Sequence, residues 1–481
     1  MDITREIIGV LLSLLYVFAV LLITETYAKK KKNIKKENTR KTIHILISHY
    51  VFIVYFFNSS VWFAVIPSLL FIVVNTLSRK YNLIKSMERS DNNDSLDTIW
   101  YSVSATLVVV CAYLLNIKEV LLISMLILGY GDGMAALIGI KYGKHKILTS
   151  TKTFEGTLTM FCATAILYSA YQYIIYEKFE LRLILSICIL ATFCECIAKK
   201  GLDNLLIPIT ISLILTYYHF VSDCVATIFI ISIIVLFIFI VWIIGALTLS
   251  ACIMTILMMT LVYLSVGIVP LIGIVVFLIF SSIISIPSNV SKNNARQLHK
   301  RSGVRSCIQV LANGSVTVIL SIIFYFTKLD AVWFGIFVSL AVASSDTFSS
   351  EIGMLSKKTP VSILTFKRIN TGLSGGITFL GILGSFIGAA VVGSVILSSR
   401  IEMFMGIVIF GVIGSIIDSI IGATLQIKYI TLEGVITEKE FYNEEKLKVY
   451  SGITWMNNDY VNFISILLTT FLSIFIYQLF S

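Results

Sequence analysis

The sequence predicts an all-α polytopic membrane protein with about sixteen transmembrane helices in two tandem, homologous helical bundles. Three observations predict it. Of the 481 residues, 57% are hydrophobic and only 13% are charged, whereas soluble chains carry about 25% charged residues. The apolar residues form long runs, and the basic residues gather in alternate loops. A soluble fold cannot bury so much apolar surface, so lipid must surround most of the chain.

Apolar runs long enough to cross a bilayer, about 20 residues each, follow one another along the chain. Short polar breaks such as Asn58-Ser59-Ser60 alternate with long polar loops. The first predicted domain, 1–245, holds runs at 7–25, 42–57, 61–77, 98–115, 119–138, 157–175, 182–198, 204–219 and 224–245. The second, 246–481, holds runs at 247–265, 267–286, 307–326, 331–345, 375–397, 402–424 and 461–480.

Basic residues orient these spans, because cytoplasmic loops are enriched in Lys and Arg. The basic arm at 29–41 is placed in the cytoplasm. Alternation then places six further loops inside: 78–97, 139–156, 199–203, 287–306, 346–374 and 425–460. The inner segments hold 31 of the 37 Lys and Arg residues, and the outer ones hold Arg5, Lys118, Lys178, Arg182, Lys328 and Arg400. We expect both termini outside, in the cell membrane of a bacterium.

The net charge of +10 is explained by cytoplasmic loops beside anionic lipid, so no nucleic-acid partner is expected. The eight cysteines show no metal-type spacing and are interpreted as free thiols.

Two inner loops, within 131–156 and 345–376, share an order of residues. In each, an acid at the end of an apolar helix, Asp132 or Asp346, precedes an Ile-Gly pair. An Ile-Leu-Thr triplet follows, then basic residues, then glycines expected to open the next helix.

A later pair of segments also matches, because Glu195 and Asp418 each precede an acidic, amide-containing turn and a further helix. The two turns contain Asp203-Asn204 and Asn458-Asp459. We infer two homologous domains in tandem that meet near residue 246.

Acids at a bilayer boundary are costly and therefore indicate function. One set comprises Asp132, Glu155, Glu195 and Asp203, and the other comprises Asp346, Glu351, Asp418 and Asp459. Carboxylates suit Mg²⁺, which binds few protein groups and leaves room for phosphates. Basic residues beside glycine-flanked helix N-termini suit polyphosphate. The mixture fits a metal–nucleotide complex better than a cation pore.

Structural interpretations stay open for several of these residues. Gly139 and Gly143 could serve helix packing, because small residues four apart let helices approach. Lys152 and Glu155 could form a surface ion pair of little energy. A lone histidine such as His44 is usually structural. Alternatively, His44, Arg40 and Lys41 share one helical face and could bind phosphate together. No Walker-type phosphate loop, protein-kinase motif, zinc-protease motif or serine-hydrolase motif occurs.

Residues from about 40 to 215 resemble the polyprenol kinase family, which includes dolichol kinase and phytol kinase and is related to the CDP-diacylglycerol synthases. The resemblance lies in Arg40-Lys41-x-x-His44, Gly131-Asp132-x-x-Ala135 with Gly139 and Gly143, Lys152-Thr153-x-Glu155-Gly156, Glu195, and Leu202-Asp203-Asn204 before Pro208. It implies a CTP-dependent kinase of a long isoprenoid alcohol. The stretch containing Lys152, Thr153, Glu155 and Gly156 would bind nucleotide.

Residues from about 250 to 480 resemble the phytyl-phosphate kinase family, long catalogued as a domain of unknown function. The matching residues are Arg305, Gln309 to Asn313-Gly314, Ala343 to Thr347 with Asp346, Ser350-Glu351-Ile352-Gly353, Thr365-x-Lys367-Arg368, Gly372-x-Ser374-Gly375-Gly376, Gly414 to Gln426 with Asp418, and Asn457-Asn458-Asp459.

The two resemblances together imply a bifunctional kinase. The first domain would convert an isoprenoid alcohol, such as phytol, farnesol or geranylgeraniol, to its monophosphate, and the second would make the diphosphate. CTP or another nucleoside triphosphate would be co-substrate, with Mg²⁺ as cofactor and membrane lipid around the chain. Phosphoryl transfer depends mainly on positioning and charge neutralisation.

Roles follow from this implied chemistry. Asp132, Glu195, Asp346 and Asp418 would bind the metal, with Glu155 and Glu351 as further catalytic acids. Lys152, Lys367 and Arg368 would neutralise the transferring phosphoryl group. The expected nucleotide- or phosphate-binding residues are Arg40, Lys41, His44, Gly139, Gly143, Thr153, Gly156, Asp203, Asn204, Arg305, Asn313, Gly375, Gly376, Asn458 and Asp459.

Three alternatives stay open. Cytidylyl transfer, as in CDP-lipid synthesis, would use the same nucleotide and similar acids but release diphosphate. A secondary transporter is a non-enzymatic alternative, because repeats with polar residues are typical of transporters. One domain could also be an inactive scaffold.

Overall fold

The computed structural model describes residues 2–30, 36–81, 96–147, 152–286, 304–397, 400–431, 434–442 and 445–480. Part of the predicted basic arm (Lys31, Lys32 and Lys35) and the Leu148-Thr149 part of the first repeated loop lie outside the described residues. The chain divides into two compact units, unit 1 (Met1–Ile243) and unit 2 (Ile244–Ser481).

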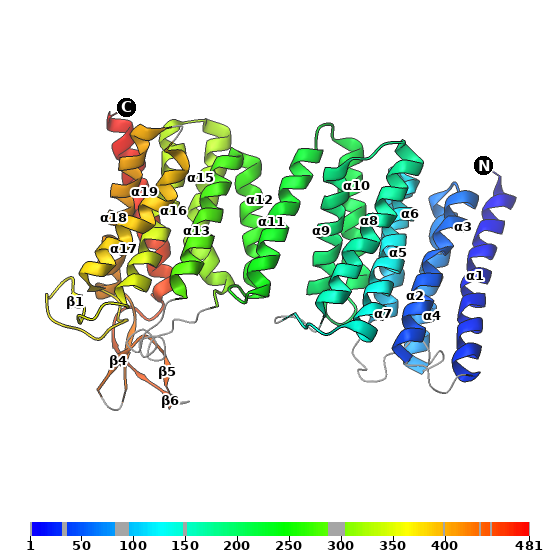
Figure 1. Ribbon diagram of the computed structural model, residues 1–481, viewed down its shortest axis with the longest axis horizontal. Helices are drawn as coiled ribbons and strands as arrows, with labels where there is room; N and C mark the ends of the chain where they lie inside the picture. Colours follow the sequence, from blue (N-terminus) through cyan, green and yellow to red (C-terminus); the bar gives the residue numbers. More distant parts are fainter. Residues whose placement is uncertain are drawn as a thin grey trace. The chain divides into compact units, whose positions relative to one another are not determined.

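Unit 1 consists of helices (Figure 1). In chain order they are α1 (Ile3–Lys30), α2 (Lys36–Ser48), α3 (Tyr50–Phe57), α4 (Val61–Tyr81), α5 (Asp97–Leu114), α6 (Lys118–Leu126), the π-helical turn η1 (Ile127–Asp132), α7 (Gly133–Tyr142), α8 (Phe154–Tyr176), α9 (Leu181–Ile197), α10 (Asp203–Phe220) and α11 (Val225–Ile243).

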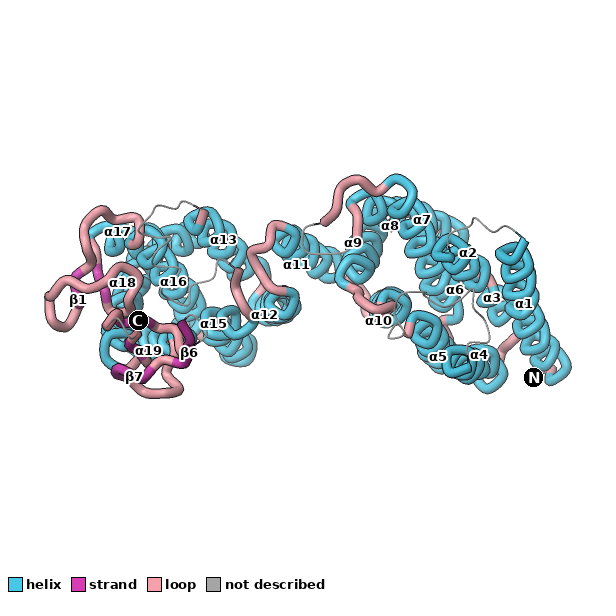
Figure 2. Tube along the Cα trace, turned by 90° about the horizontal axis from the view of Figure 1, so that it is seen from below, coloured by secondary structure: helices cyan, strands magenta, loops and turns pink. Residues whose placement is uncertain are grey.

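Unit 2 combines helices with short strands (Figure 2). Its elements are α12 (Leu249–Val266), α13 (Ile268–Ser285), α15 (Cys307–Thr327), α16 (Asp330–Gly353), β1 (Val361–Ser362), β2 (Gly376–Ile377), α17 (Phe379–Gly393), the 3-10 turn η2 (Ser394–Ile396), α18 (Ile401–Thr424), β3 (Lys428–Ile430), β4 (Ile436–Thr437), β5 (Phe441–Tyr442), β6 (Glu445–Lys446), β7 (Lys448–Ser451) and α19 (Asn458–Phe480).

The strands form three small antiparallel sheets, β1-β2, β4-β3-β7 and β5-β6. Figure 1 shows them at one end of the unit 2 helices, opposite the end where the chain terminates. The sequence predicts only an inner loop at 425–460, so the β-structure between α18 and α19 is an addition to the predicted fold.

Thirteen of the described helices are long and apolar enough to cross a membrane, which confirms the predicted all-α polytopic fold. Helices also occupy the other three predicted ranges. The run at 42–57 is split at His49 into α2 and α3, and the run at 182–198 is the 17-residue α9. The run at 204–219 is α10, in which Asp203, Asn204 and Pro208 lower the apolar character.

The predicted end of the span at 331–345 is wrong, because α16 continues to Gly353. Asp346 and Glu351 therefore project from the last turns of a helix rather than from a loop. The hydroxyl of Thr347 donates to the carbonyl of Ala343 at 2.9 Å. A polar side chain that hydrogen-bonds to a carbonyl of its own helix can be accommodated within that helix.

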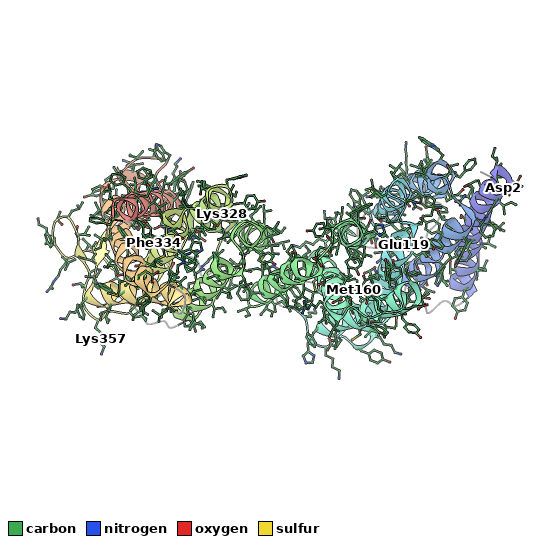
Figure 3. The ribbon with its side chains drawn as sticks, turned by 90° about the horizontal axis from the view of Figure 1, so that it is seen from above. Asp2, Glu119, Met160, Lys328, Phe334 and Lys357 are labelled. Atoms are coloured by element: carbon green, nitrogen blue, oxygen red, sulfur yellow. The ribbon has the colours of Figure 1, made fainter. Side chains whose placement is uncertain are left out.

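Small residues hold α16 against α17. A β-carbon added at Gly384 or Gly388 would lie 2.7 Å from a main-chain carbonyl oxygen of α16. Ser344 donates a hydrogen bond from its hydroxyl to the carbonyl of Gly388 at 2.8 Å. Such close approach is typical of helix packing in membranes, and it makes α16 the most buried of the thirteen described spans. Phe334 of α16 lies among the helices of its unit (Figure 3).

Candidate active sites

Asp132 is the centre of a buried charge cluster in unit 1. It ends the π-helical turn η1, an irregularity that occurs frequently at functional sites. Its Oδ2 forms an ion pair with the ammonium of Lys41 on α2, and Nε2 of His44 lies 3.6 Å from the same oxygen. Its Oδ1 has no hydrogen-bond partner among the described residues, so the carboxylate retains capacity for a ligand.

Lys152 joins a second group of acids to this cluster. Its Nζ lies 2.6 Å from Oε1 of Glu195 on α9 and 3.4 Å from Oδ2 of Asp203 at the start of α10. Burial disfavours the ammonium, but the field of Glu195, Asp203 and Asp132 outweighs burial and raises the pKa of Lys152. Lys152 therefore stays charged close to Asp132.

Arg40 is held by two acids that the sequence analysis did not select. Its Nη1 lies 2.7 Å from Oδ2 of Asp97, and its guanidinium also pairs with Glu37 one turn earlier. These contacts raise the pKa of Arg40 against the effect of burial. Asn204 donates from its side-chain amide to the carbonyl of Asp97 at 2.8 Å. The sequence signal that could have identified an acid such as Asp97 is its place in the first turn of a membrane span opposite a basic helix.

An apolar cavity of about 680 Å³ adjoins this network in unit 1. Its polar edge is formed by Arg40, His44, Asp97 and Asn204. Its apolar walls come from α1, α2, α4 and α5 and include Val17, Leu21, Ile43, Phe71, Val74 and Tyr101. An apolar cavity with a few polar groups at its edge is typical of a small-molecule site.

The glycines predicted to bind phosphate in unit 1 lie at a helix crossing. A β-carbon at Gly139 would lie 3.5 Å from the α-carbon of Gly156 and 3.0 Å from Oγ1 of Thr153. One at Gly143 would lie 2.2 Å from a carbonyl oxygen. Thr153 caps α8 by accepting from the N–H of Gly156 at 3.3 Å. This geometry favours the packing alternative for these residues.

Glu155 lies outside the buried cluster. Its carboxylate accepts from the backbone N–H of Lys144 at 3.1 Å and contacts Nδ1 of His145 at 2.7 Å. The structure therefore pairs it with the preceding turn rather than with Lys152, so it is not brought to the predicted catalytic position.

A polar cavity of about 600 Å³ marks the corresponding region of unit 2. Both predicted metal-binding acids, Asp346 of α16 and Asp418 of α18, line it, together with Gly375 and Gly376. Gly375 has φ +86°, and a β-carbon there would lie 2.5 Å from Cβ of Ala423. Only glycine suits this backbone position. Gly375 precedes β2 and Gly376 begins it, so neither opens α17, which begins after the capping residue Thr378.

Asp418 accepts a hydrogen bond from α19, and α19 in turn contacts α15. Ser465 donates to Oδ2 of Asp418 at 3.0 Å. Asn462 donates to Oδ1 of Asn313 at 3.4 Å; with its amide turned over, it would donate to Oδ2 of Asp418 at 3.1 Å and to the carbonyl of Asn458. Asp459 lies in the first turn of the same helix.

A second cavity in unit 2, of about 570 Å³, has mainly apolar walls. Its apolar residues include Met258, Met259, Ile274, Phe277, Leu278 and Leu340. Its polar lining includes Arg305, Gln309 and Asn313. Because Asn313 also contacts Asn462, this cavity adjoins the network of Asp418.

Lys367 and Arg368 are exposed on the segment between β1 and β2, and neither lines the polar cavity. Thr378 caps α17 by accepting from the N–H of Gly381 at 3.0 Å, as Thr153 caps α8. A β-carbon at Gly353 would lie 3.4 Å from the α-carbon of Gly381, like the 3.5 Å between Gly139 and Gly156.

This local geometry favours a different alignment of the two loops from the predicted one. Thr153 and Gly156 would correspond to Thr378 and Gly381, and Lys152 to Ile377 rather than to Lys367 or Arg368. In unit 2 the hairpin β1-β2 lies between Asp346 and Thr378.

The β-structure of unit 2 contacts the polar cavity through Glu438, which was not selected from the sequence. Its Oε1 accepts from the backbone N–H of Ser374, a cavity-lining residue, at 2.8 Å. Nearby, Lys428 donates to the carbonyl of Ala423 at 3.0 Å. Burial lowers the pKa of Lys428, and Glu438 offsets part of that effect.

Among the described residues, no group of three or more His, Cys, Asp or Glu side chains is close enough to hold a metal alone. Mg²⁺ commonly uses only one or two carboxylates and completes its shell with waters and phosphate oxygens. In unit 1, Oδ1 of Asp132 and Oε2 of Glu195 are buried and without a partner among the described residues. These atoms, and the cavity-lining Asp346 and Asp418, fit such a partial set.

Comparison with known proteins places the chain in a family. Residues 232–470 match the family described as Integral membrane protein DUF92. The chain is also 30% identical over 229 residues to Protein PGR of Arabidopsis thaliana, covering 42% of this chain and 78% of that protein. The chain belongs to the DUF92 family of integral membrane proteins.

Two other relatives are similar to parts of the chain. Phytol kinase of Synechocystis is 28% identical over 211 residues, which cover 43% of this chain and 90% of that enzyme. An uncharacterized membrane protein of Methanocaldococcus jannaschii is 36% identical over 126 residues, 26% of this chain and 52% of that protein. No solved structure matches the chain.

Proposed function

We propose that this protein is a membrane phosphotransferase that phosphorylates an isoprenoid alcohol and then its monophosphate. The observation that carries the proposal is the placement of Asp132, Lys41 and Lys152 in one charged cluster beside the apolar cavity of unit 1. A lipid alcohol requires an apolar pocket for its chain, and phosphoryl transfer requires concentrated charge at its hydroxyl. The similarity to phytol kinase supports the same class of substrate.

In unit 1 the alcohol would place its chain in the 680 Å³ cavity and its hydroxyl near His44. The alcohol oxygen forms a bond to the terminal phosphorus of the nucleotide, the bond from that phosphorus to the bridging oxygen breaks, and the nucleoside diphosphate leaves. The hydroxyl proton passes to a carboxylate of the cluster or to water. Lys41 and Lys152 would stabilise the charge on the transferring group.

Asp132 and Glu195 are the residues that would hold Mg²⁺ in unit 1. When bound, the ion would neutralise charge on the phosphate oxygens. The protein's own contribution is to keep these acids buried, oriented and close to two ammonium groups. Positioning of this kind supplies much of the rate enhancement in phosphoryl transfer.

Unit 2 would carry out the second step in its polar cavity, where Asp346 and Asp418 would play the part of the unit 1 acids. The repeated Asp–Gly–Thr–Gly geometry supports a shared origin of the two sites. The nucleotide is proposed to be CTP from the family resemblance, and the phosphate sites to face the cytoplasm from the basic-loop pattern.

The test is product analysis with purified, detergent-solubilised protein, Mg²⁺ and labelled CTP or ATP, with phytol, farnesol and geranylgeraniol as acceptors. We expect lipid monophosphate, then lipid diphosphate, with CDP or ADP as co-product. Release of inorganic diphosphate with a CDP-lipid would establish cytidylyl transfer instead. No turnover of any lipid alcohol by folded protein would reject the proposal in favour of transport.

A further inference from the structure

The apolar cavities of the two units differ in the charge at their edges. In unit 1 the arginine at the edge, Arg40, is ion-paired with both Asp97 and Glu37. In unit 2 the arginine at the edge is Arg305, and among the described residues no carboxylate lies within ion-pair distance of its guanidinium. The arginine at the first edge is thus ion-paired, and the arginine at the second has no ion-paired acid among the described residues.

The surroundings of Arg305 support this contrast. Its guanidinium lies 5.9 Å from the centre of the Phe277 ring, against an apolar wall of the cavity. Burial lowers the pKa of Arg305, and Glu351 offsets this only in part, whereas the acids beside Arg40 raise the pKa of that residue. A cation without a paired acid is costly to bury, so an anionic group at this edge would relieve the penalty.

The remaining polar lining of the unit 2 cavity can complete an anion site. Gln309 and Asn313 lie on α15, directly after Arg305, and line the same cavity. Asn313 contacts Asn462, which neighbours Asp418 of the polar cavity. An anionic head bound by Arg305 would therefore lie beside the network of Asp418, one of the acids proposed to hold Mg²⁺ in unit 2.

We propose that Arg305 is the specificity-determining residue of unit 2, where it binds the phosphate monoester of an isoprenyl monophosphate whose chain fills the 570 Å³ cavity. The unit 1 cavity, with Arg40 already neutralised, accepts the uncharged alcohol. This assignment rests on the proposed function, because it takes the second acceptor to be the product of the first step. It separates the two acceptors by charge rather than by chain shape.

The experiment uses full-length protein and a C20 isoprenyl monophosphate as acceptor. Arg305→Gln should raise KM for the monophosphate by about 10- to 100-fold, which is the usual worth of a charge-assisted hydrogen bond. The kcat at saturating monophosphate should change little, and Arg305→Lys should recover part of the affinity. Phosphorylation of the alcohol by unit 1 should stay at the wild-type rate.

Arg400→Gln is the matched control, because Arg400 also belongs to unit 2 but pairs with Asp330 at the first turn of α16, far from Glu351 on that helix. It should leave KM for the monophosphate unchanged. Direct binding without nucleotide, measured by thermal stabilisation with the monophosphate and the alcohol, separates affinity from turnover. An anionic phospholipid, phosphatidylglycerol, should not compete for this site.

The outcomes separate the two proposals. Diphosphate formation with an unchanged KM in Arg305→Gln, or equal competition by phosphatidylglycerol, would overturn the role of Arg305 while the proposed function stands. A different result would be that the wild type binds the monophosphate without phosphorylating it, and that Arg305→Gln does not bind it. That result would overturn the proposed function of unit 2 and support Arg305 as the anion site. Loss of alcohol phosphorylation in Arg305→Gln would indicate misfolding, and the thermal unfolding midpoint of the variant checks this. If Arg305→Gln is misfolded, the KM of Arg305→Lys for the monophosphate tests the role of Arg305 instead.

Discussion

Lys41 and Asp132 form an ion pair inside unit 1 although 91 residues separate them in the chain. Both side chains are almost fully buried. Breaking a buried pair on one side leaves an uncompensated charge and costs about 3–5 kcal/mol, whereas removing both charges is often nearly neutral. The pair therefore allows the structural role of Asp132 to be separated from its proposed chemical role.

Asp132→Asn should lower the free energy of unfolding by about 3–5 kcal/mol and reduce phosphorylation of the alcohol on the order of a hundredfold or more. The double variant Lys41→Met/Asp132→Asn should recover most of the stability but none of the activity. Thermal unfolding and lipid-product analysis on the same preparations measure both effects. Recovery of activity in the double variant would show that Asp132 serves folding alone.

Asp346→Asn should stop the second step and leave the first intact, so that isoprenyl monophosphate accumulates from alcohol and nucleotide. The physical reason is that Asp346 lines the polar cavity of unit 2, and the unit 1 cluster does not depend on it. Asp330→Asn, at the exposed first turn of the same helix, is the control and should behave as the wild type. If Asp346→Asn instead blocks use of the alcohol, the proposed division of labour is wrong.

The Lys152 ammonium should stay charged throughout the physiological pH range. Its pKa is raised above the ordinary 10.5, so its stabilising contribution is complete below about pH 10 and is lost only as the pH rises through the higher folded-state value. The unfolding free energy of Lys152→Met should therefore stay below that of the wild type from about pH 6 to about pH 10. A difference that disappears near neutral pH would contradict the ion pairs with Glu195 and Asp203.

Gly375→Ala should disturb the polar cavity, because residue 375 has φ +86° and a β-carbon there would meet Ala423 at 2.5 Å. A left-handed backbone costs an L-residue roughly 1–2 kcal/mol, and the crowding adds about 1–3 kcal/mol. Gly434→Ala is the matched control: its φ is +79°, but among the described residues no atom lies within 4 Å of a β-carbon placed there. Only Gly375→Ala should slow diphosphate formation; equal effects would show that backbone strain alone matters.

The basic-loop pattern predicts that the residues near Asp132 and Asp346 face the same compartment. Single cysteines replacing the exposed Lys144 and Lys357, in a chain whose eight native cysteines are changed to alanine, test this. Figure 3 labels Lys357 on the surface of unit 2. A membrane-impermeant maleimide should label both positions only after the cytoplasmic side is made accessible. Labelling from opposite sides would refute the predicted topology.

Much of the fold could be predicted from hydropathy, because crossing lipid requires long apolar runs and helices satisfy the backbone within each run. The hydropathy of the sequence predicted the ends of the helices less accurately. α16 continues through Asp346 and Glu351, and small sheets follow α18, because side-chain bonds and packing decide those boundaries.

The candidate site was partly predictable. Asp132, Lys152 and Glu195 stand out as charges at the ends of apolar runs, and the structure brings them together. Asp97, which pairs with Arg40, was missed because the two residues lie on different helices, and Glu37, one turn before Arg40 on α2, was not selected. Lys367 and Arg368 lie on the exposed segment between β1 and β2 and do not line the polar cavity.

The sequence by itself determined that this chain crosses a membrane many times, and where its scarce charges lie. The tertiary structure decided which of those charges meet, that each unit has an apolar cavity beside them, and that Arg40 is neutralised while Arg305 lacks an ion-paired acid among the described residues. The reason is physical: burial in lipid depends on composition along the chain, whereas the strength of a charge pair depends on distance in space.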